Sequence, residues 1–385
     1  MPAKPHVIIV GAGIVGLANA LAAQQAGWRV SVFERNHRSL GASVRNFGMF
    51  WPIAQKTEFT HRMAMQGRET WVRLAEATGL HLRPCGSLFL AINPDELALM
   101  EEFSRHQAAE GLDLEFLGKD ETLARSAIAN PKRVLGGLYS PHEANIDPRE
   151  AIAKIADYLN AQDDVEVHFS APVSRVSGNQ VTLSDGRKLE AERIVICQGD
   201  DAQQLFPDIM AAQTELRSCK LHMLRSTPFK RDIGPMIASA LSLRHYEPFE
   251  VCQSFRTYSD RISAEKPEID RFGIHVMASQ SRSGHLVLGD SHQYDLDEPQ
   301  FDEAQIDEII LRELGELLEP ELVVDQRWKG FYQKREGHLA FIHDVDDHTR
   351  IFNGLGGSGM TQSFGYAAQL WQDWNNPLLV SGVPG

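Results

Sequence analysis

Three glycines near the N-terminus constrain the fold of this chain more than any other feature. They stand in the segment Gly11-Ala-Gly13-Ile-Val-Gly16, which follows the apolar run 6–10 and precedes the helix-forming run 17–23. A short run rich in β-branched residues is typical of a buried parallel strand, and alanine and leucine favour a helix. The pattern therefore predicts a strand, a tight glycine turn and a helix in immediate succession.

Each glycine of this turn has its own structural role. In such a unit the first glycine makes the turn, the second lets the backbone approach a pyrophosphate, and the third lets the helix pack close to the strand. The helix N-terminus adds unpaired N–H groups for the phosphates. A second predicted strand, 29–33, ends at Glu34, whose carboxylate suits ribose hydroxyls and argues against a 2′-phosphate. The unit predicts a dinucleotide site and leaves FAD and NAD open.

Composition and charge exclude several classes of protein. The 385-residue chain has 43% hydrophobic and 23% charged residues, as ordinary globular proteins do, and a formal net charge of −14. An acidic chain is a poor candidate for nucleic-acid binding, which needs clustered Lys and Arg. Its four cysteines form no CxxC pair, so no metal centre and no redox dithiol are expected. We expect reduced thiols in a cytoplasmic protein without a signal peptide or a membrane span.

The rest of the chain alternates helical and strand-like segments. Helices are predicted over 57–79, 94–110, 147–160 and 302–318, and mostly short strands between 215 and 289. This order predicts an α/β fold with an inserted, strand-rich second domain. The first domain is expected to comprise 1–80, 146–215 and 323–385, and the second 81–145 and 216–322.

A second glycine cluster stands near the C-terminus. A strand ending at Phe352 is followed by Gly354, Gly356, Gly357 and Gly359, and then by a predicted helix. Glycine is entropically costly in a simple linker, so four of them predict a loop that brings backbone N–H groups against a group that becomes negative. A reduced flavin carries its charge at the N1–C2=O edge, which a helix N-terminus stabilises.

Taken together, these segments resemble the D-amino-acid-oxidase superfamily of flavoenzymes, which includes glycine- and sarcosine-oxidase-like enzymes. The resemblance covers the whole chain and implies a Rossmann-like FAD-binding domain with an inserted antiparallel-sheet substrate domain. Some relatives attach flavin to a cysteine shortly before the terminal loop, and residues 325–385 contain none, so non-covalent FAD is expected. The residues that the resemblance implies for FAD binding are Gly11, Gly13, Gly16, Glu34, Arg35, Ser43, Arg45, Asn46, Val173, Gly199, Gly356, Gly357, Ser358, Gly359, Met360 and Thr361.

One departure from the family bears on the substrate. The amino-acid oxidases usually carry Arg in a Gly-Phe-Arg-Pro segment that grips the substrate carboxylate, and here that position is Tyr332. A loop that continues with Lys334 and Arg335 is expected to keep cations nearby. The segment 42–52 resembles a subgroup associated with aminophosphonate breakdown, which implies oxidation of 2-aminoethylphosphonate or an N-alkyl derivative. Its Phe50 and Trp51 are further substrate-binding candidates.

The implied reaction transfers hydride from the amine's α-carbon to flavin N5, and the resulting imine hydrolyses to an aldehyde plus ammonia or an alkylamine. O2 or another acceptor would reoxidise the flavin. His275, together with His245 and His292, is a candidate base, but no spacing distinguishes any of them from a structural histidine, so no catalytic residue is assigned.

Three alternatives remain. The first is a sarcosine, glycine or D-amino-acid oxidase or dehydrogenase. The second is a flavin monooxygenase, because the segment 289–292 resembles the Gly-Asp loop of flavin hydroxylases; the acidic turn after it favours a strand end instead. The third is an FAD-bound assembly or electron-transfer subunit.

Overall fold

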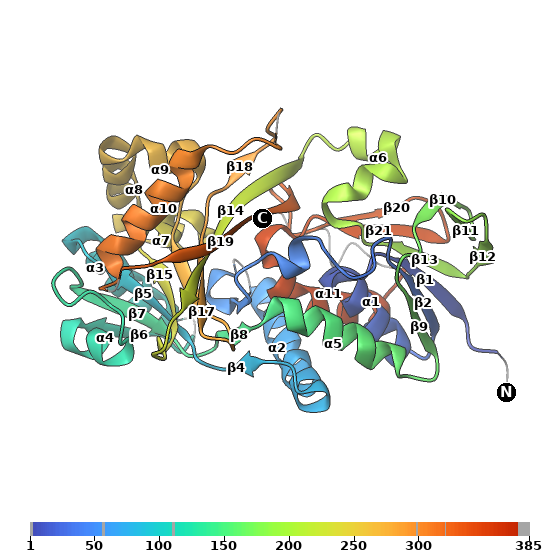
Figure 1. Ribbon diagram of the computed structural model, residues 1–385, viewed down its shortest axis with the longest axis horizontal. Helices are drawn as coiled ribbons and strands as arrows, with labels where there is room; N and C mark the ends of the chain where they lie inside the picture. The colour runs from blue at the N-terminus through green and yellow to red at the C-terminus, as the bar shows by residue number, and fades with distance from the viewer. Residues whose placement is uncertain (1–2, 56–57, 110–111, 298, 320, 376–385) are drawn as a thin grey trace.

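The computed structural model describes residues 3–55, 58–109, 112–297, 299–319 and 321–375. Two large sheets lie side by side, with the six-stranded sheet on the right of Figure 1 and the nine-stranded sheet on the left. Helices cover both sheets. The predicted α/β class is confirmed.

The six-stranded sheet carries the N-terminal unit at its centre. Its order is β20 (Phe341–Asp344), β21 (Thr349–Asn353), β13 (Arg193–Ile196), β1 (His6–Val10), β2 (Arg29–Phe33) and β9 (Val165–His168). All neighbours are parallel except β20 and β21. Every residue of β1 is buried, as expected for a parallel strand covered on both faces.

A layer of helices shares one apolar core with this sheet. The helices are α1 (Ile14–Gln25), α2 (Glu58–Thr78), α5 (Pro148–Asn160) and α11 (Gly359–Gln372). The carboxylate of Asp147 accepts hydrogen bonds from the backbone N–H groups of Arg149 and Glu150 and so caps the N-terminus of α5. A three-stranded antiparallel sheet shares a second core with the six-stranded sheet, and it comprises β10 (Val173–Ser177), β11 (Gln180–Leu183) and β12 (Lys188–Glu190).

The nine-stranded sheet is mostly antiparallel. Its order is β18 (Gln293–Tyr294), β14 (Leu216–Pro228), β17 (His285–Gly289), β16 (Met277–Gln280), β15 (Met236–Ser239), β5 (Ser87–Ala91), β7 (Gly136–Ser140) and β6 (Glu115–Gly118), and β19 (Val324–Arg335) also pairs with β14. Only the β5–β15 pair is parallel. The range 323–385, predicted to belong wholly to the first domain, therefore contributes one long strand to this sheet. The division into domains stays a prediction.

The segment 215–289 differs from its predicted run of short strands. Three helices interrupt it: α7 (Leu241–His245), α8 (Ser254–Glu265) and α9 (Pro267–Phe272). Helix α8 buries only Tyr258 and Ile262, one turn apart, and its other positions are largely polar. Two apolar positions give a weak helical period, and contact with the core decides the conformation.

The remaining elements complete the chain. A small antiparallel sheet joins β3 (Met49–Phe50), β8 (Ala144–Ile146) and β4 (Leu82–Arg83). The other helices are α3 (Pro94–Ala109), α4 (Lys119–Arg125), α6 (Pro207–Ala211) and α10 (Ala304–Leu317), with 3₁₀ turns η1 (Ala42–Val44), η2 (Pro52–Ala54), η3 (Gly199–Gln204), η4 (Glu247–Val251) and η5 (Gly356–Ser358).

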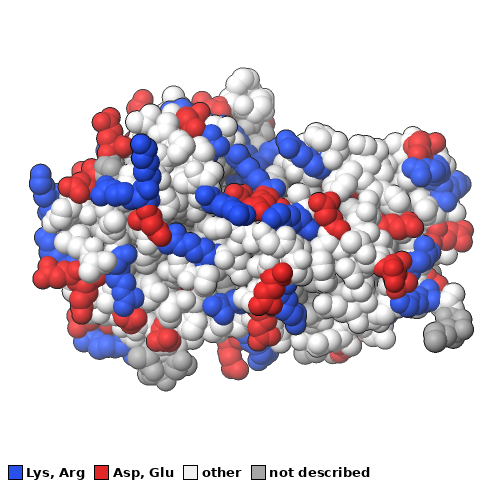
Figure 2. Space-filling model, turned by 60° about the horizontal axis from the view of Figure 1, so that its bottom comes forward, with Lys and Arg blue, Asp and Glu red and all other residues white. Residues whose placement is uncertain are grey.

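The surface mixes charges of both signs. On the face drawn in Figure 2, acidic and basic side chains of the described residues are interspersed, with no broad basic area. Among the described helices, none combines the length and the apolar character that crossing a bilayer requires.

Candidate cofactor and substrate cavity

One large cavity of about 490 Å³ runs along the edge where β1, β2 and β13 end. Val10, Phe33 and Cys197, at or just after the ends of these three strands, line it. In open α/β sheets, ligands bind outside the carboxyl ends of the strands. The cavity continues past the terminal glycine loop to a group of polar side chains on the nine-stranded sheet.

The N-terminal turn fits a dinucleotide. Gly11 has φ +104°, and a Cβ there would lie 2.4 Å from the Cys197 carbonyl oxygen, so only glycine fits. A Cβ on Gly16 would lie 1.9 Å from the Gly11 oxygen, which explains the close contact of helix and turn. Gly11 and Gly13 line the cavity and Gly16 does not, in keeping with its role in packing.

The side chains beside this turn face the same space. The buried Glu34 carboxylate accepts hydrogen bonds from the backbone N–H of Ala12 (3.1 Å) and of Asn36 (3.0 Å). The Ser43 hydroxyl accepts a hydrogen bond from the N–H of Ile14, 2.9 Å away, at the start of α1. Both residues line the cavity at the helix N-terminus, where an anion is favoured.

The other predicted residues of the first domain also reach the cavity. The Asn46 amide donates to the carbonyls of Ala42 and Ser43 and accepts from the N–H of Gly48, so it holds the loop in shape. The Arg45 guanidinium donates to the Lys329 carbonyl at 3.4 Å. Arg35, Arg45, Asn46, Val173 and Gly199 all line the cavity, and Arg35 forms an ion pair with Asp201.

The terminal glycine loop closes over the long strand β19. Gly354 and Gly356 have φ +71° and +57°, values that favour glycine, and a Cβ on Gly356 would lie 3.3 Å from Cγ of Lys334. Helix α11 begins at Gly359, and its first N–H groups have no partner within the helix. Every residue from Gly356 to Thr361 lines the cavity. This arrangement can place backbone donors against a flavin ring.

The neighbouring side chains of Phe50 and Trp51 lie in different environments. The Phe50 ring is fully buried in the core with α2 and α11 and does not line the cavity. Trp51 lines it, and its backbone N–H donates to the Thr361 hydroxyl at 2.9 Å. Neighbouring residues of an extended chain point to opposite sides, so only one of the two can face a ligand.

The cations after Tyr332 lie in strand β19, not in the loop that the sequence predicted. The ladder with β14 continues to the pair of Leu216 and Arg335, because the inter-strand hydrogen bonds outweigh the polar sequence. Arg335 forms an ion pair with Glu215 at 3.1 Å. The Lys334 ammonium has no hydrogen-bond or ion-pair partner within the described ranges and lines the cavity. Burial raises the pKa of the Tyr332 hydroxyl well above its ordinary value.

Three histidines meet beside Tyr332. The ring centroids of His245 and His275 are 4.0 Å apart, and those of His245 and His292 are 4.2 Å apart. Burial and the neighbouring imidazole of His292 hold the pKa of His275 well below its ordinary value, and burial together with the Lys334 charge lowers the pKa of His292 to about 4. Burial and the two neighbouring imidazoles also hold the pKa of His245 well below its ordinary value. All three histidines were candidates from the sequence, but their spacing along the chain did not indicate that they lie together.

Asp290 is a cavity residue that the sequence analysis did not assign. It directly follows β17, so the strand end predicted for the Gly-Asp segment is confirmed. Its carboxyl Oδ1 lies 3.4 Å from Nε2 of His275, and burial raises its pKa well above the ordinary value. The Gly-Asp segment was predicted to be a strand end, and this prediction gave Asp290 no role in a site.

Comparisons with known proteins agree with this geometry. The sequence profile of the DAO family, described as FAD dependent oxidoreductase, matches residues 6–372. Among solved structures, L-proline dehydrogenase from P. horikoshii superposes with a TM-score of 0.77 at 17% identity, covering 98% of this chain and 94% of that one. At this identity the likeness shows the fold.

Curated relatives match about half of the chain. Human mitochondrial sarcosine dehydrogenase is 25% identical over 179 residues, which are 46% of this chain and 19% of that protein. The mouse mitochondrial pyruvate dehydrogenase phosphatase regulatory subunit is 24% identical over 212 residues, 53% of this chain and 24% of that protein. The chain thus spans about a quarter or less of the length of these two relatives.

Proposed function

Because the chain belongs to the DAO family of FAD dependent oxidoreductases, we propose that it oxidises the C–N bond of a small anionic amine with non-covalently bound FAD. The observation that carries the proposal is the single cavity that joins the fingerprint turn, the terminal glycine loop and the polar group around Tyr332. A cofactor bound along the strand ends would face the terminal loop with its redox-active ring.

The residues of this chain have distinct proposed roles. When bound, FAD would accept the hydride from the carbon next to the amine nitrogen. The N-terminus of α1 and Ser43 would hold the pyrophosphate, and Glu34 the ribose. The loop from Gly356 to Thr361 would present N–H groups to the negative charge of the reduced ring.

The proposed substrate carries a phosphonate, as in 2-aminoethylphosphonate or an N-alkyl derivative. Tyr332 stands where the carboxylate-gripping Arg is expected and supplies one donor in place of a bidentate fork. Lys334, whose ammonium has no partner among the described residues, lies two positions along the same strand, hence on the same face as Tyr332. A point charge and a hydroxyl suit an anion with three acceptor oxygens.

A second candidate is oxidation of an amine that carries a carboxylate. The observation in its favour is the match to sarcosine dehydrogenase and the structural likeness to L-proline dehydrogenase, whose names both specify secondary amino acids. The match to a phosphatase regulatory subunit keeps a non-catalytic role as a third outcome.

Steady-state kinetics on one panel separate these outcomes. The panel contains N-methyl-2-aminoethylphosphonate, 2-aminoethylphosphonate, sarcosine, glycine and D-alanine, with O2 and an artificial dye as alternative electron acceptors. The proposal expects the highest kcat/KM for a phosphonate. An equal or higher value for sarcosine or D-alanine would establish the amino-acid reaction instead, and no anaerobic flavin bleaching by any amine would support the non-catalytic role.

Acid precipitation tests how the cofactor is held. No cysteine lies between residues 325 and 385 to form a thioether with the flavin near the terminal loop. The yellow chromophore is therefore expected in the supernatant after the protein is precipitated. Colour that stays with the pellet would show a covalent link at another residue.

Free thiols support a reducing compartment. Cys85, Cys197, Cys219 and Cys252 are all unpaired, and the last three are buried. Unpaired cysteines are usual in the cytosol, so we keep the cytoplasm as the proposed location.

A further inference from the structure

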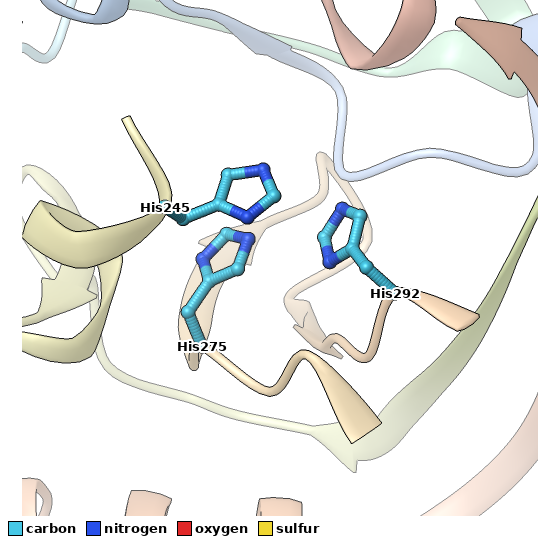
Figure 3. A group of neighbouring side chains, drawn as sticks. All are labelled: His245, His275 and His292. Atoms are coloured by element: carbon cyan, nitrogen blue, oxygen red, sulfur yellow. The ribbon is translucent and has the colours of Figure 1, made fainter. Parts of the chain in front are cut away.

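His245, His275 and His292 approach one another from three separate segments, as Figure 3 shows. His245 ends helix α7, His275 precedes β16, and His292 follows β17. One ring nitrogen of each lies within 4.8 Å of those of the other two. All three residues line the cavity, so the cluster borders the space proposed for the substrate.

Backbone hydrogen bonds position two of these histidines together with Asp290. The N–H of His275 donates to the carbonyl of Asp290 at 3.3 Å, and the N–H of Asp290 donates to the carbonyl of His275 at 3.0 Å. The N–H of His292 donates to the Phe272 carbonyl at 2.9 Å. These bonds continue the pairing of β16 with β17, so the imidazole of His275 and the carboxyl of Asp290 are positioned by the sheet.

Two of the rings have a hydrogen-bond partner on the side away from the cluster, and the partner of His292 determines which of its nitrogens is free. Nδ1 of His292 lies 3.2 Å from the Gly273 carbonyl oxygen. A carbonyl can only accept, so Nδ1 carries the proton and Nε2 keeps its lone pair. Nδ1 of His275 lies 3.0 Å from the Ser242 hydroxyl, which can accept or donate. Nε2 of His275 is available in the tautomer in which Nδ1 donates to this hydroxyl. This outer set of bonds is the one that metal-binding histidines show.

The atoms left over are electron donors without partners. Nε2 of His275 and Oδ1 of Asp290 are buried and make no hydrogen bond within the described residues. They lie 3.4 Å apart, and Nε2 of His292 lies 3.8 Å from Oδ2 of Asp290. If the three imidazoles served only as a packed core, these buried atoms would stay unsatisfied, which is unfavourable. A cation would satisfy them together.

We propose that His245, His275 and His292 bind a divalent transition-metal ion, with Asp290 as its anionic partner. Imidazole and carboxylate ligands suit Zn²⁺, Co²⁺, Ni²⁺ or Cu²⁺. In tetrahedral geometry with Zn–N bonds near 2.0–2.1 Å, ligand nitrogens are about 3.3 Å apart, so the rings must converge by about 1.5 Å or less. The nearby Lys334 charge opposes the ion, and the Asp290 carboxylate offsets it.

Metal binding is independent of the proposed reaction, because it is measured without turnover. The FAD-loaded full chain is freed of metal with a chelator, its flavin spectrum is checked, and Co²⁺ is added. Bound Co²⁺ absorbs at wavelengths beyond the flavin bands, and elemental analysis after desalting gives the stoichiometry with Zn²⁺. We expect one ion per chain. An FAD-loaded protein that takes up neither ion stoichiometrically overturns the proposal.

Single substitutions test which side chains bind the ion. His275→Ala and His292→Ala should abolish stoichiometric uptake, and Asp290→Asn should weaken binding by roughly ten- to hundredfold. His285→Gln is the matched control, since this partly buried histidine of β17 lies outside the cavity and bonds to Ser283 instead. Uptake that survives both Ala substitutions places the ion elsewhere and refutes the proposal. If those variants lose FAD, His245→Ala, at the half-buried end of α7, provides the same test.

Discussion

The backbone N–H of Trp51 donates a 2.9 Å hydrogen bond to the side-chain oxygen of Thr361. This bond joins the polar segment that follows the fingerprint to the first turn of the C-terminal helix, more than 300 residues later. The two segments border the same cavity. Their contact makes this part of the cavity depend on two segments that are far apart in the sequence.

Replacing Thr361 with Val tests this connection. Valine has the shape of threonine without the hydroxyl, so the buried N–H of Trp51 loses its acceptor, at a cost of about 1–3 kcal/mol in the free energy of unfolding. Hydrogen exchange of the peptide that contains Trp51 should become faster. Thr361→Ser keeps the oxygen and should leave this exchange nearly unchanged. Equal exchange in the two variants would contradict the role of the bond.

Although Lys334 and Arg335 are adjacent in the sequence, their substitutions are expected to affect substrate turnover differently. Arg335 is engaged with Glu215 and Lys334 is unpaired in the described chain. Lys334→Ala should therefore lower kcat/KM for an anionic amine by roughly ten- to hundredfold, the effect of one lost charge-assisted hydrogen bond, and Arg335→Ala should lower it less. Lys188→Ala removes an exposed positive charge from the β12 hairpin and controls for net charge. An unchanged kcat/KM in Lys334→Ala would exclude Lys334 as the anion's partner.

The local part of the proposed cofactor site was predictable from the sequence. Local sequence patterns identify three of its features: the turn at Gly11, the acid Glu34 and the loop before Gly359. The conformation of each is determined within one βαβ unit or one loop. The long helices were predictable for the same reason, since their periodicity repeats over several turns.

The polar end of the cavity was not predictable from local patterns. His275 and Asp290 become neighbours because β16 pairs with β17, with Met277 opposite Gly289, and His245 arrives on a helix that the sequence analysis missed. A correct prediction of the pairing of β16 with β17 would have placed His275 near Asp290. Strand pairing is non-local, so composition and spacing carry little information about it.

Two glycines allow helices α2 and α11 to cross closely. A Cβ on Gly365 would lie 2.1 Å from the Met63 carbonyl oxygen, and a Cβ on Gly67 would lie 2.8 Å from the Thr361 carbonyl oxygen. Gly365→Ala should therefore destabilise the protein by roughly 1–3 kcal/mol, because the helices must move apart. The matched control is Gly315→Ala in α10, where a Cβ meets no atom within 4 Å. That change should raise stability by about 0.5–1 kcal/mol through helix propensity. Urea unfolding measures both, and equal effects would refute the packing argument.

Glu143 predicts a pH dependence of stability. Its side chain is fully buried, and its carboxylate accepts a hydrogen bond from the N–H of Ile53 at 2.9 Å, in the segment next to Trp51. Burial raises the pKa of Glu143 above its ordinary value, although the Ser140 hydroxyl and the Ile53 N–H oppose the shift. The folded state thus holds a proton that the unfolded state releases near its ordinary pKa of about 4.3.

The sign of the effect follows from proton linkage. Between the two pKa values the folded chain binds more protons, so the free energy of unfolding falls as pH rises from about 4.3 through the raised pKa, by up to about 1.4 kcal/mol per pH unit. Glu143→Gln keeps an oxygen for the Ile53 N–H and cannot titrate. Its stability relative to the unsubstituted protein should therefore increase with pH across this interval. Urea unfolding of the FAD-loaded protein at a series of pH values measures the difference, with Glu250→Gln, an exposed position, as the control. A Glu143→Gln difference that stays flat with pH would mean that Glu143 is ionised in the folded protein.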